Sequence, residues 1–495
     1  MRALLMRLTL ASFLFLAVAC NKDLLPRPPV ESRLYYPSGV AFVPPGDPDG
    51  GLGRLYVANS DFDRRFDVGW VTAVDLSQVR SPDGRTLPLP GQAVAPPPDG
   101  GSDQGRPVQF TNLATTSANI VNISPFAGLA TVDDAGTRLF VPSRAEGDEL
   151  AVMDIALGAD GGAPIRCFFS GGSDCTVDAI RLARAQDPGQ IGVPAAPQPY
   201  SVTLAPPFPD GSPDDRIYVS HLRPASSPAQ SITNLENFLV TLHQADLDQA
   251  RASWATDGGY IVPDSAFSSI GHGASNTIII APVEKDFLYI SGRSKLVSTD
   301  LDVLLRVVDR QSNLVAYPQL QLVYASLDAR ALQIRPDGRR LYLATDNPAT
   351  LLILDVTTSP IPDLPPVFTL VRAVPLPEGP NDVQIITRPK RAPLVVVSCS
   401  VDGSLAFYDD DLGQIAALVP GVGAVPFAIA IDRRGDDFAR LYVSNFGDGR
   451  IAVVDVPLSV GAAGGRLSPR IVAHVGMKQY CLLATDDRNC VDTTP

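Results

Sequence analysis

One pattern of residues recurs seven times along this chain of 495 residues. In each copy, a run of aromatic and β-branched residues leads through a polar turn into a second such run, which ends in Asp. Two clear copies are RLYLATDNPATLLILDV from Arg340 to Val356 and RLYVSNFGDGRIAVVDV from Arg440 to Val456. Two β-prone runs joined by a turn predict a hairpin, so the chain repeats a two-stranded unit.

The spacing of the copies sets the size of the repeated unit. The closing aspartates are Asp75, Asp154, Asp246, Asp309, Asp355, Asp409 and Asp455. Asp309 and Asp355 are 46 residues apart, as are Asp409 and Asp455, and a four-stranded propeller blade takes about 40–45 residues. We interpret the aspartates as turn or capping residues whose carboxylates accept backbone N–H bonds.

Two further strands are predicted for most units. One precedes each copy, as in QPYSVTLAPP and AVPFAIAIDRRG, and a weaker one follows the Asp, as near Phe368, Ile415 and Arg470. A single four-stranded sheet cannot bury both of its faces, but sheets stacked around an axis cover one another. The sequence therefore predicts an all-β, seven-bladed β-propeller of four-stranded antiparallel blades with loop insertions.

The copies resemble the repeats of YVTN-type seven-bladed propellers, which read roughly P-x-x-V-x-x-S-P-D-G-x-x-L-Y-V-x-N. The segment from Arg440 to Val456, with VPFAIAID before it, is the copy most similar to that repeat, and the resemblance extends from about residue 36 to residue 476. It implies the propeller fold. Propellers in general include lactonases, quinoproteins, haem enzymes and binding scaffolds, so the fold does not select an activity.

The first twenty residues have the pattern of an export signal. Arg2 and Arg7 precede an apolar run from Leu8 to Val18, which is too short to span a bilayer. The run ends in LAVAC and resembles the bacterial lipobox, which implies cleavage before Cys20 and diacylation of its thiol. The alternative is an ordinary signal peptide with an incidental cysteine. Because Asn21 rather than Asp follows Cys20, the retention signal of inner-membrane lipoproteins is absent, and we expect an outer-membrane lipoprotein that faces the periplasm or the cell surface.

These features divide the chain into four parts. We predict a signal peptide at 1–19, a tether at 20–32, the propeller at 33–476 and a tail at 477–495. Residues 77–122 are expected to form an insertion between the first and second units, and 247–273 an added loop. The N-terminal strand SRLYY, from Ser32 to Tyr36, either pairs with the last blade, or the ring closes by packing alone.

Five cysteines remain besides Cys20. Cys167 and Cys175 are close in sequence, as are Cys481 and Cys490. In a chain bound for an oxidising compartment this spacing predicts two short-loop disulfides, the second as a clip in the tail. Cys399 lies in the predicted strand VVVSCSV, where we expect a buried free thiol.

The charge limits the partners. The formal net charge is −13, which disfavours nucleic acid and anionic lipid. No other segment is apolar enough to span a bilayer, so the membrane is expected to hold only the lipid. We predict a monomer whose partner is an unidentified envelope protein or a small ligand.

The first strand of each blade is expected to line the central channel. The residue after its opening position should lie at one mouth; these residues are Ser38, Phe126, Tyr200, Ser275, Arg330, Asn381 and Phe427. Phe126, Tyr200, Arg330, Asn381 and Phe427 are candidates for holding a small anionic or amphipathic ligand. The alternative is that these side chains only plug the rim.

Motifs for catalysis are missing from the sequence. The four histidines have no zinc-site spacing, and there is no G-x-S-x-G, Walker or C-x-x-C-H motif. We therefore predict no catalytic residue, no metal ligand and no cofactor. Calcium is a lesser alternative at two carboxylate groups: Asp61, Asp63 and Asp67, and Asp409, Asp410 and Asp411.

The resulting functional prediction is a lipid-anchored propeller of the cell envelope that acts as a non-catalytic binding or assembly scaffold. The alternative is a lactonase-like hydrolase whose site, with Arg330 as its best candidate residue, lies at the channel mouth.

Overall fold

The computed structural model describes most of the predicted propeller. The described residues are 33–46, 51–62, 66, 68–98, 106–144, 148–155, 165–182, 198–208, 211–222, 236–257, 262–272, 274–282, 287–293, 304–316, 328–359, 364–458 and 466–477. The predicted signal peptide, Cys20, the tether and the Cys481–Cys490 pair lie outside these residues.

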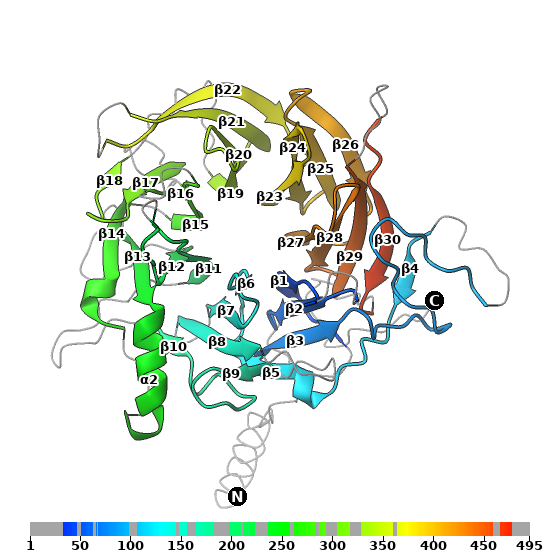
Figure 1. The fold of residues 1–495 in the computed structure, drawn as a ribbon, viewed down its shortest axis with the longest axis horizontal. Helices are drawn as coiled ribbons and strands as arrows, with labels where there is room; N and C mark the ends of the chain where they lie inside the picture. The colour runs from blue at the N-terminus through cyan, green and yellow to red at the C-terminus, as the bar shows by residue number, and fades with distance from the viewer. Residues whose placement is uncertain are drawn as a thin grey trace, which may run out of the picture.

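Seven blades of antiparallel strands surround a common axis, which confirms the predicted seven-bladed propeller (Figure 1). Blade 1 contains β1 (Pro37–Val43), β2 (Arg54–Asn59), β3 (Gly69–Asp75) and β5 (Ile120–Ile123). Blade 2 contains β6 (Thr131–Val132), β7 (Arg138–Ser143) and β8 (Glu149–Ile155), and both β9 (Ile165–Cys167) and β10 (Ile180–Arg181) pair with β8. Blade 3 contains β11 (Pro199–Leu204), β12 (Arg216–His221), β13 (Glu236–His243) and β14 (Phe267–His272).

The remaining blades follow in chain order. Blade 4 contains β15 (Ala274–Ile280), β16 (Phe287–Arg293), β17 (Leu305–Asp309) and β18 (Val315–Ala316), and blade 5 contains β19 (Asp328–Ile334), β20 (Arg340–Asp346), β21 (Thr350–Thr357) and β22 (Val367–Pro375). Blade 6 contains β23 (Pro380–Arg388), β24 (Arg391–Cys399), β25 (Ser404–Asp409) and β26 (Gln414–Pro420). Blade 7 contains β27 (Pro426–Asp432), β28 (Phe438–Asn445), β29 (Arg450–Pro457) and β30 (Arg470–Val475). A single pairing of Arg293 with Asp328 joins blades 4 and 5 into one sheet.

The core is divided among the contacts between blades. Each of the seven pairs of neighbouring blades has its own cluster of buried apolar side chains. Strands such as β24 and β28 are therefore buried on both faces, and for this reason they read as continuous apolar runs rather than as alternating patterns. Burial of apolar surface between blades, rather than within one blade, stabilises the ring.

In several blades, a serine in the second strand accepts a hydrogen bond from a backbone amide that a bulge in the first strand leaves unpaired. The register between these two strands shifts near the start of the first strand, for example between Pro426 and Ile429. The Ser444 hydroxyl accepts the N–H of Ala428 at 2.9 Å, and the Ser398 hydroxyl accepts that of Asp382 at 3.0 Å. A serine at this position of the second strand thus pairs an amide that the bulge removes from the strand ladder.

The predicted insertion at 77–122 is placed differently in the structure. It lies within blade 1, between β3 and β5, rather than between the first two units, and β5 is the outer strand of blade 1. The connection crosses to blade 7, where β4 (Val108–Phe110) pairs with β30 in parallel. We call its described parts, 76–98 and 106–119, the clasp. The clasp lies beside blade 7 at the right of Figure 1.

Ring closure follows neither of the two predicted routes alone. Residues 33–36 form no strand, but Leu34 is fully buried in the apolar cluster between blades 7 and 1. Packing therefore closes the ring, and the clasp reinforces it. Arg440 of β28 donates hydrogen bonds to the carbonyls of Pro88 and Leu89, and the N–H of Gly91 donates to Asp455 Oδ2 at 2.9 Å.

Blade 3 departs from the repeat. The strand β13 ends at His243, opposite Arg216, and α2 (Gln244–Asp257) begins there, so Asp246 lies in a helix and does not close a strand. The predicted loop at 247–273 was therefore wrong: it contains most of α2, the short 3₁₀ helix Asp264–Ala266 and β14. The clasp contains a second short 3₁₀ helix, Ser117–Asn119. No helix among the described residues is long and apolar enough to cross a membrane.

Candidate functional site

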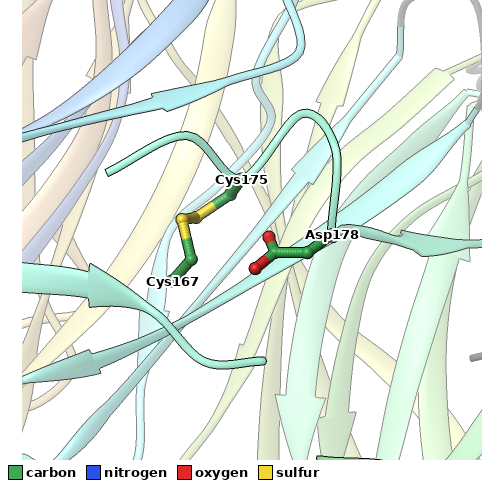
Figure 2. A group of neighbouring side chains, drawn as sticks. All are labelled: Cys167, Cys175 and Asp178. Carbon is green, nitrogen blue, oxygen red and sulfur yellow. A yellow bond between two sulfur atoms is a disulfide. The ribbon is translucent and has the colours of Figure 1, made fainter. Parts of the chain in front are cut away.

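The disulfide between Cys167 and Cys175 is confirmed (Figure 2). Asp178 lies beside it, and the three side chains form the one His/Cys/Asp/Glu group with metal-site spacing in the described part of the chain. Thiolates are the cysteine species that bind metals, and these sulfurs are bonded to each other instead. Asp178 Oδ2 accepts the N–H of Ser170 at 2.8 Å, so its carboxylate orders the loop.

The disulfide loop joins blades 1 and 2. The N–H of Cys175 donates to the Asn122 carbonyl at 2.9 Å, and the N–H of Asn122 donates to the Ser173 carbonyl at 2.8 Å. On its other side, the ring of Phe169 stacks on Trp254 of α2, with ring centres 4.5 Å apart. The loop therefore has a structural role at the outer edge of the ring.

Cys399 is a buried free thiol, as predicted. Burial raises the pKa of its thiol to about 12. The side chain is thus held in the unreactive thiol form and packs as a small apolar group.

The residues predicted at the channel mouth fall into two groups. Ser38, Tyr200 and Ser275 are buried. Asn381 is half-buried at the start of β23, and Arg330 forms ion pairs with Asp328 at 2.9 Å and Asp346 at 3.2 Å. These five side chains do not form one cluster, whereas Phe126 and Phe427 are half-buried members of the aromatic group described below.

Polar side chains on the innermost strands connect neighbouring blades. Thr203 Oγ1 donates to the Ile278 carbonyl at 2.7 Å, linking blades 3 and 4. Asn276 Nδ2 donates to the Ala329 carbonyl at 2.5 Å, linking blades 4 and 5. These groups hold the ring together around its axis.

Asp382 links blades 6 and 7 in the same way. Its Oδ2 accepts the N–H of Ile429 at 2.8 Å, and its Oδ1 accepts a hydrogen bond from Gln384 at 3.2 Å. Burial raises the pKa of this carboxyl to about 7, and the hydrogen bonds only partly offset that effect. Asp382 is therefore a titratable group inside the framework that sequence reasoning missed.

The carboxylates proposed from the sequence as calcium ligands form hydrogen bonds with protein groups instead. Asp409 forms two 2.8 Å hydrogen bonds with Arg388, and Asp410 binds Arg340 at 2.9 Å. Burial opposes ionisation of Asp409, but the Arg388 guanidinium holds its pKa below the ordinary range.

Arginine also contacts the third member of this group, because Arg391 Nε donates to Asp411 Oδ2 at 3.1 Å. In the other group, Asp61 accepts the N–H of Phe66 at 3.2 Å, while Asp63 and Asp67 lie outside the described residues.

The predicted capping role of the closing aspartates holds at several blades. Asp75 accepts the N–H of Ser77 at 2.9 Å, and Asp309 accepts that of Ser312 at 2.7 Å. In other blades the Asp pairs with the Arg that opens the repeat, as Asp355 does with Arg340 at 3.0 Å. The strand register explains this pairing, because it places the Arg directly opposite the Asp.

Five aromatic rings gather on the face of the ring where the innermost strands begin. We call Tyr36, Phe62, Phe126, Phe427 and Phe446 the mouth patch. Phe62 contacts Phe126 and Phe446 with ring centres 5.5 Å apart, and Tyr36 contacts Phe446 at 5.1 Å. Phe427 contacts Phe446 at 5.9 Å. The patch spans blades 7, 1 and 2, and the Phe62 side chain is 46% exposed.

Sequence reasoning found Phe126 and Phe427 but missed the other three rings. Phe62 and Phe446 each follow the end of a second strand, at the same face where the first strands begin. The signal for Phe62 and Phe446 was an aromatic residue just after the Asn-Ser or Ser-Asn that ends the second strand of the repeat.

A second apolar surface lies on the outer strands of blades 5 and 6. We call Leu364, Val367, Val371, Leu412 and Leu418 the rim patch; their exposed fractions are 49%, 60%, 47%, 56% and 55%. Arg372 of β22 donates to the carbonyl of Gly413 in blade 6, which links the outer parts of the two blades. Both strands are the outermost of their sheets among the described residues.

Comparison with known proteins identifies no family for this chain. No family model matches the chain, and no curated protein matches it. One similar structure is the β-propeller domain of Cps50 (Swd1) from Myceliophteria thermophila, with 12% identity, a TM-score of 0.46, and coverage of 85% of this chain and 96% of that chain.

Two bacterial structures are similar to the same degree. Hydrazine synthase of Kuenenia stuttgartiensis has 14% identity, a TM-score of 0.47, and coverage of 86% of this chain and 96% of that chain. The periplasmic gluconolactonase PpgL of Pseudomonas aeruginosa has 17% identity, a TM-score of 0.47, and coverage of 82% and 88%. At these identities the likeness concerns the fold alone, and the YVTN-type resemblance stays a prediction.

Proposed function

We propose that the chain is a lipid-anchored β-propeller of the cell envelope that acts as a non-catalytic binding or assembly scaffold. The anchor is the diacylated Cys20 predicted from the LAVAC motif, and the tether is 20–32. The observation that carries the proposal is the rim patch, because exposed apolar side chains concentrated on two outer strands are typical of surfaces that bind another protein.

The strands of the rim patch also have a free backbone edge to which a partner strand can add. β22 and β26 are outer strands, and an outer strand offers unpaired N–H and C=O groups along its free edge. An extended segment of a partner can add to such an edge, with alternate side chains contacting Val367 and Val371. We therefore propose an envelope protein with an extended apolar segment as the partner.

The polar groups near the axis support a scaffold rather than a hydrolase. Arg330 is neutralised by Asp328 and Asp346, and the Asp382 carboxyl accepts the Ile429 amide and a Gln384 hydrogen bond. These contacts explain Arg330 and Asp382 as structural residues. The lactonase-like alternative stays a prediction that no contact in the described residues favours.

Co-purification from native membranes tests the proposal. The full-length protein and a Val371→Glu/Leu418→Glu variant are solubilised from the envelope after reversible crosslinking. The proposal predicts a stoichiometric protein partner for the wild type that the variant loses, while a Gln249→Glu control on exposed α2 keeps it. Equal recovery by all three proteins, or turnover of a panel of lactones by the purified protein, would contradict it.

A further inference from the structure

The chain enters the propeller at the mouth patch. Tyr36 belongs to the patch, and the Tyr36 carbonyl accepts the N–H of Ser60 at 3.1 Å. One residue earlier, the N–H of Tyr35 donates to Asn59 Oδ1 at 2.9 Å, and its ring packs on Phe66 and Trp70 at 5.0 and 5.5 Å. Any segment that precedes Arg33 therefore leaves the ring at this face.

Backbone and side-chain contacts fix the position of the mouth patch. The N–H of Phe126 donates to the Ser60 carbonyl at 2.6 Å, which fixes blade 2 against the end of β2. Arg144 Nε donates to the Phe126 carbonyl at 3.1 Å, and its guanidinium lies 6.0 Å from the ring centre of Tyr200. Phe62 packs against three other rings of the patch and is still 46% exposed.

The tether limits how far the ring can lie from the lipid. Thirteen residues, 20–32, separate the predicted lipid from Arg33, and a fully extended chain of that length spans at most about 45 Å. A lipid at Cys20 would therefore keep the mouth patch close to the bilayer surface at high effective concentration.

We propose that the mouth patch docks on the lipid interface of the membrane that holds the anchor; this inference rests on the Cys20 anchor of the proposed function. Aromatic side chains favour the boundary between headgroups and acyl chains. The tether holds the protein at the membrane, and the patch sets its orientation. The propeller lies with the mouth face on the bilayer, with α2 and the β25–β26 turn on the opposite face.

This arrangement goes beyond the sequence prediction, in which the membrane contacts only the lipid. It also fits the negative net charge, because docking through aromatic rings needs no anionic lipid. Zwitterionic phosphatidylcholine is therefore the appropriate test surface.

Quenching by brominated lipid tests the orientation. The lipidated full-length protein is reconstituted in phosphatidylcholine vesicles that carry bromine near the headgroup end of the acyl chains. Phe62→Trp places a reporter on the patch, and Leu412→Trp places a matched reporter, 56% exposed before substitution, on the opposite face. The signal of the wild-type protein, from Trp70 and Trp254, is subtracted.

We expect several-fold stronger quenching at position 62 than at position 412. Equal quenching at the two positions in vesicle-bound protein would overturn the docking while leaving the anchor intact. Protein that lacks the lipid and stays in solution would instead refute the anchor. Hydrogen exchange of the wild type, compared between vesicle-bound and free protein, gives a second readout. Docking predicts that binding to vesicles slows exchange around residues 60–62 and 126 more than around 410–413. Exchange that binding leaves unchanged around 60–62 and 126 contradicts the docking.

Discussion

Arg440 and Asp455 lie opposite each other on β28 and β29 and form a fully buried ion pair, with Nε and Oδ1 2.7 Å apart. The same two side chains hold the clasp, through the carbonyls of Pro88 and Leu89 and the amide of Gly91. One buried pair therefore connects the last blade to a segment more than 340 residues earlier in the chain.

Loss of this arginine should destabilise the fold strongly. Arg440→Met leaves the Asp455 carboxylate buried without its cation, which costs about 3–5 kcal/mol. Chemical denaturation measures the change. The control Asp436→Ala removes a carboxylate that is 78% exposed, so its effect should stay within about 1 kcal/mol. Similar losses for the two variants would show that the buried pair is not important for closure.

The fit of the clasp is tested at Gly91. Its φ is +78°, and an added Cβ would lie 2.6 Å from the ring of Phe438. Gly84, in the same segment, has a similar φ of +83° but open space around it. Both alanine variants incur the strain of a left-handed backbone, about 1–2 kcal/mol, and only Gly91→Ala also pushes the clasp away from blade 7. Denaturation curves should therefore show a larger loss for Gly91→Ala, accompanied by faster hydrogen exchange in β30.

The sequence predicted the repeated elements well, because each repeat has the same local pattern. The hairpins around Arg340 and Arg440 and the fourth strands near Phe368 and Ile415 all lie where they were expected. Blade 3 was harder to predict, because α2 follows His243 where the other blades have a turn at the closing Asp.

The clasp could not be predicted from local pattern. The segment Val108–Phe110 is too short to signal a strand by itself, and its partner β30 is far away in sequence. The same holds for the mouth patch: Tyr36, Phe126 and Phe446 come from three blades, and only ring closure brings them together.

The buried carboxyl of Asp382 should make stability depend on pH. In the unfolded chain it ionises near its ordinary pKa of 3.8, and in the folded protein near 7. The folded state binds the proton more tightly, so this contribution is complete below about pH 4 and is lost as the pH rises towards 7. The difference amounts to at most about 4 kcal/mol.

Asp382→Asn removes the titration and keeps an oxygen for the Ile429 amide. Relative to wild type, the variant should gain stability between pH 4.5 and pH 8, as measured by urea unfolding at both values. Parallel pH profiles for the two proteins would mean that Asp382 does not titrate in this range.

Removal of the Cys167–Cys175 disulfide should act locally and moderately. The bridge spans a sequence separation of 8 residues, for which the loss is about 2–3 kcal/mol. The Cys167→Ala/Cys175→Ala variant should also loosen Phe169 from Trp254 and so change the fluorescence of that tryptophan. Cys399→Ala, a buried site outside the loop, is the control and should leave the fluorescence unchanged.

Site-specific photo-crosslinking in the native envelope tests the scaffold claim most directly. A photoreactive phenylalanine analogue is placed at Val371 or Leu418 in the rim patch, and at Gln249 on α2 as the control. Binding through the outer strands predicts one recurrent protein adduct from both rim positions and none from Gln249. Rim positions that give no adduct, or the same mixture of adducts as Gln249, would contradict the claim that this propeller binds a partner through its outer strands.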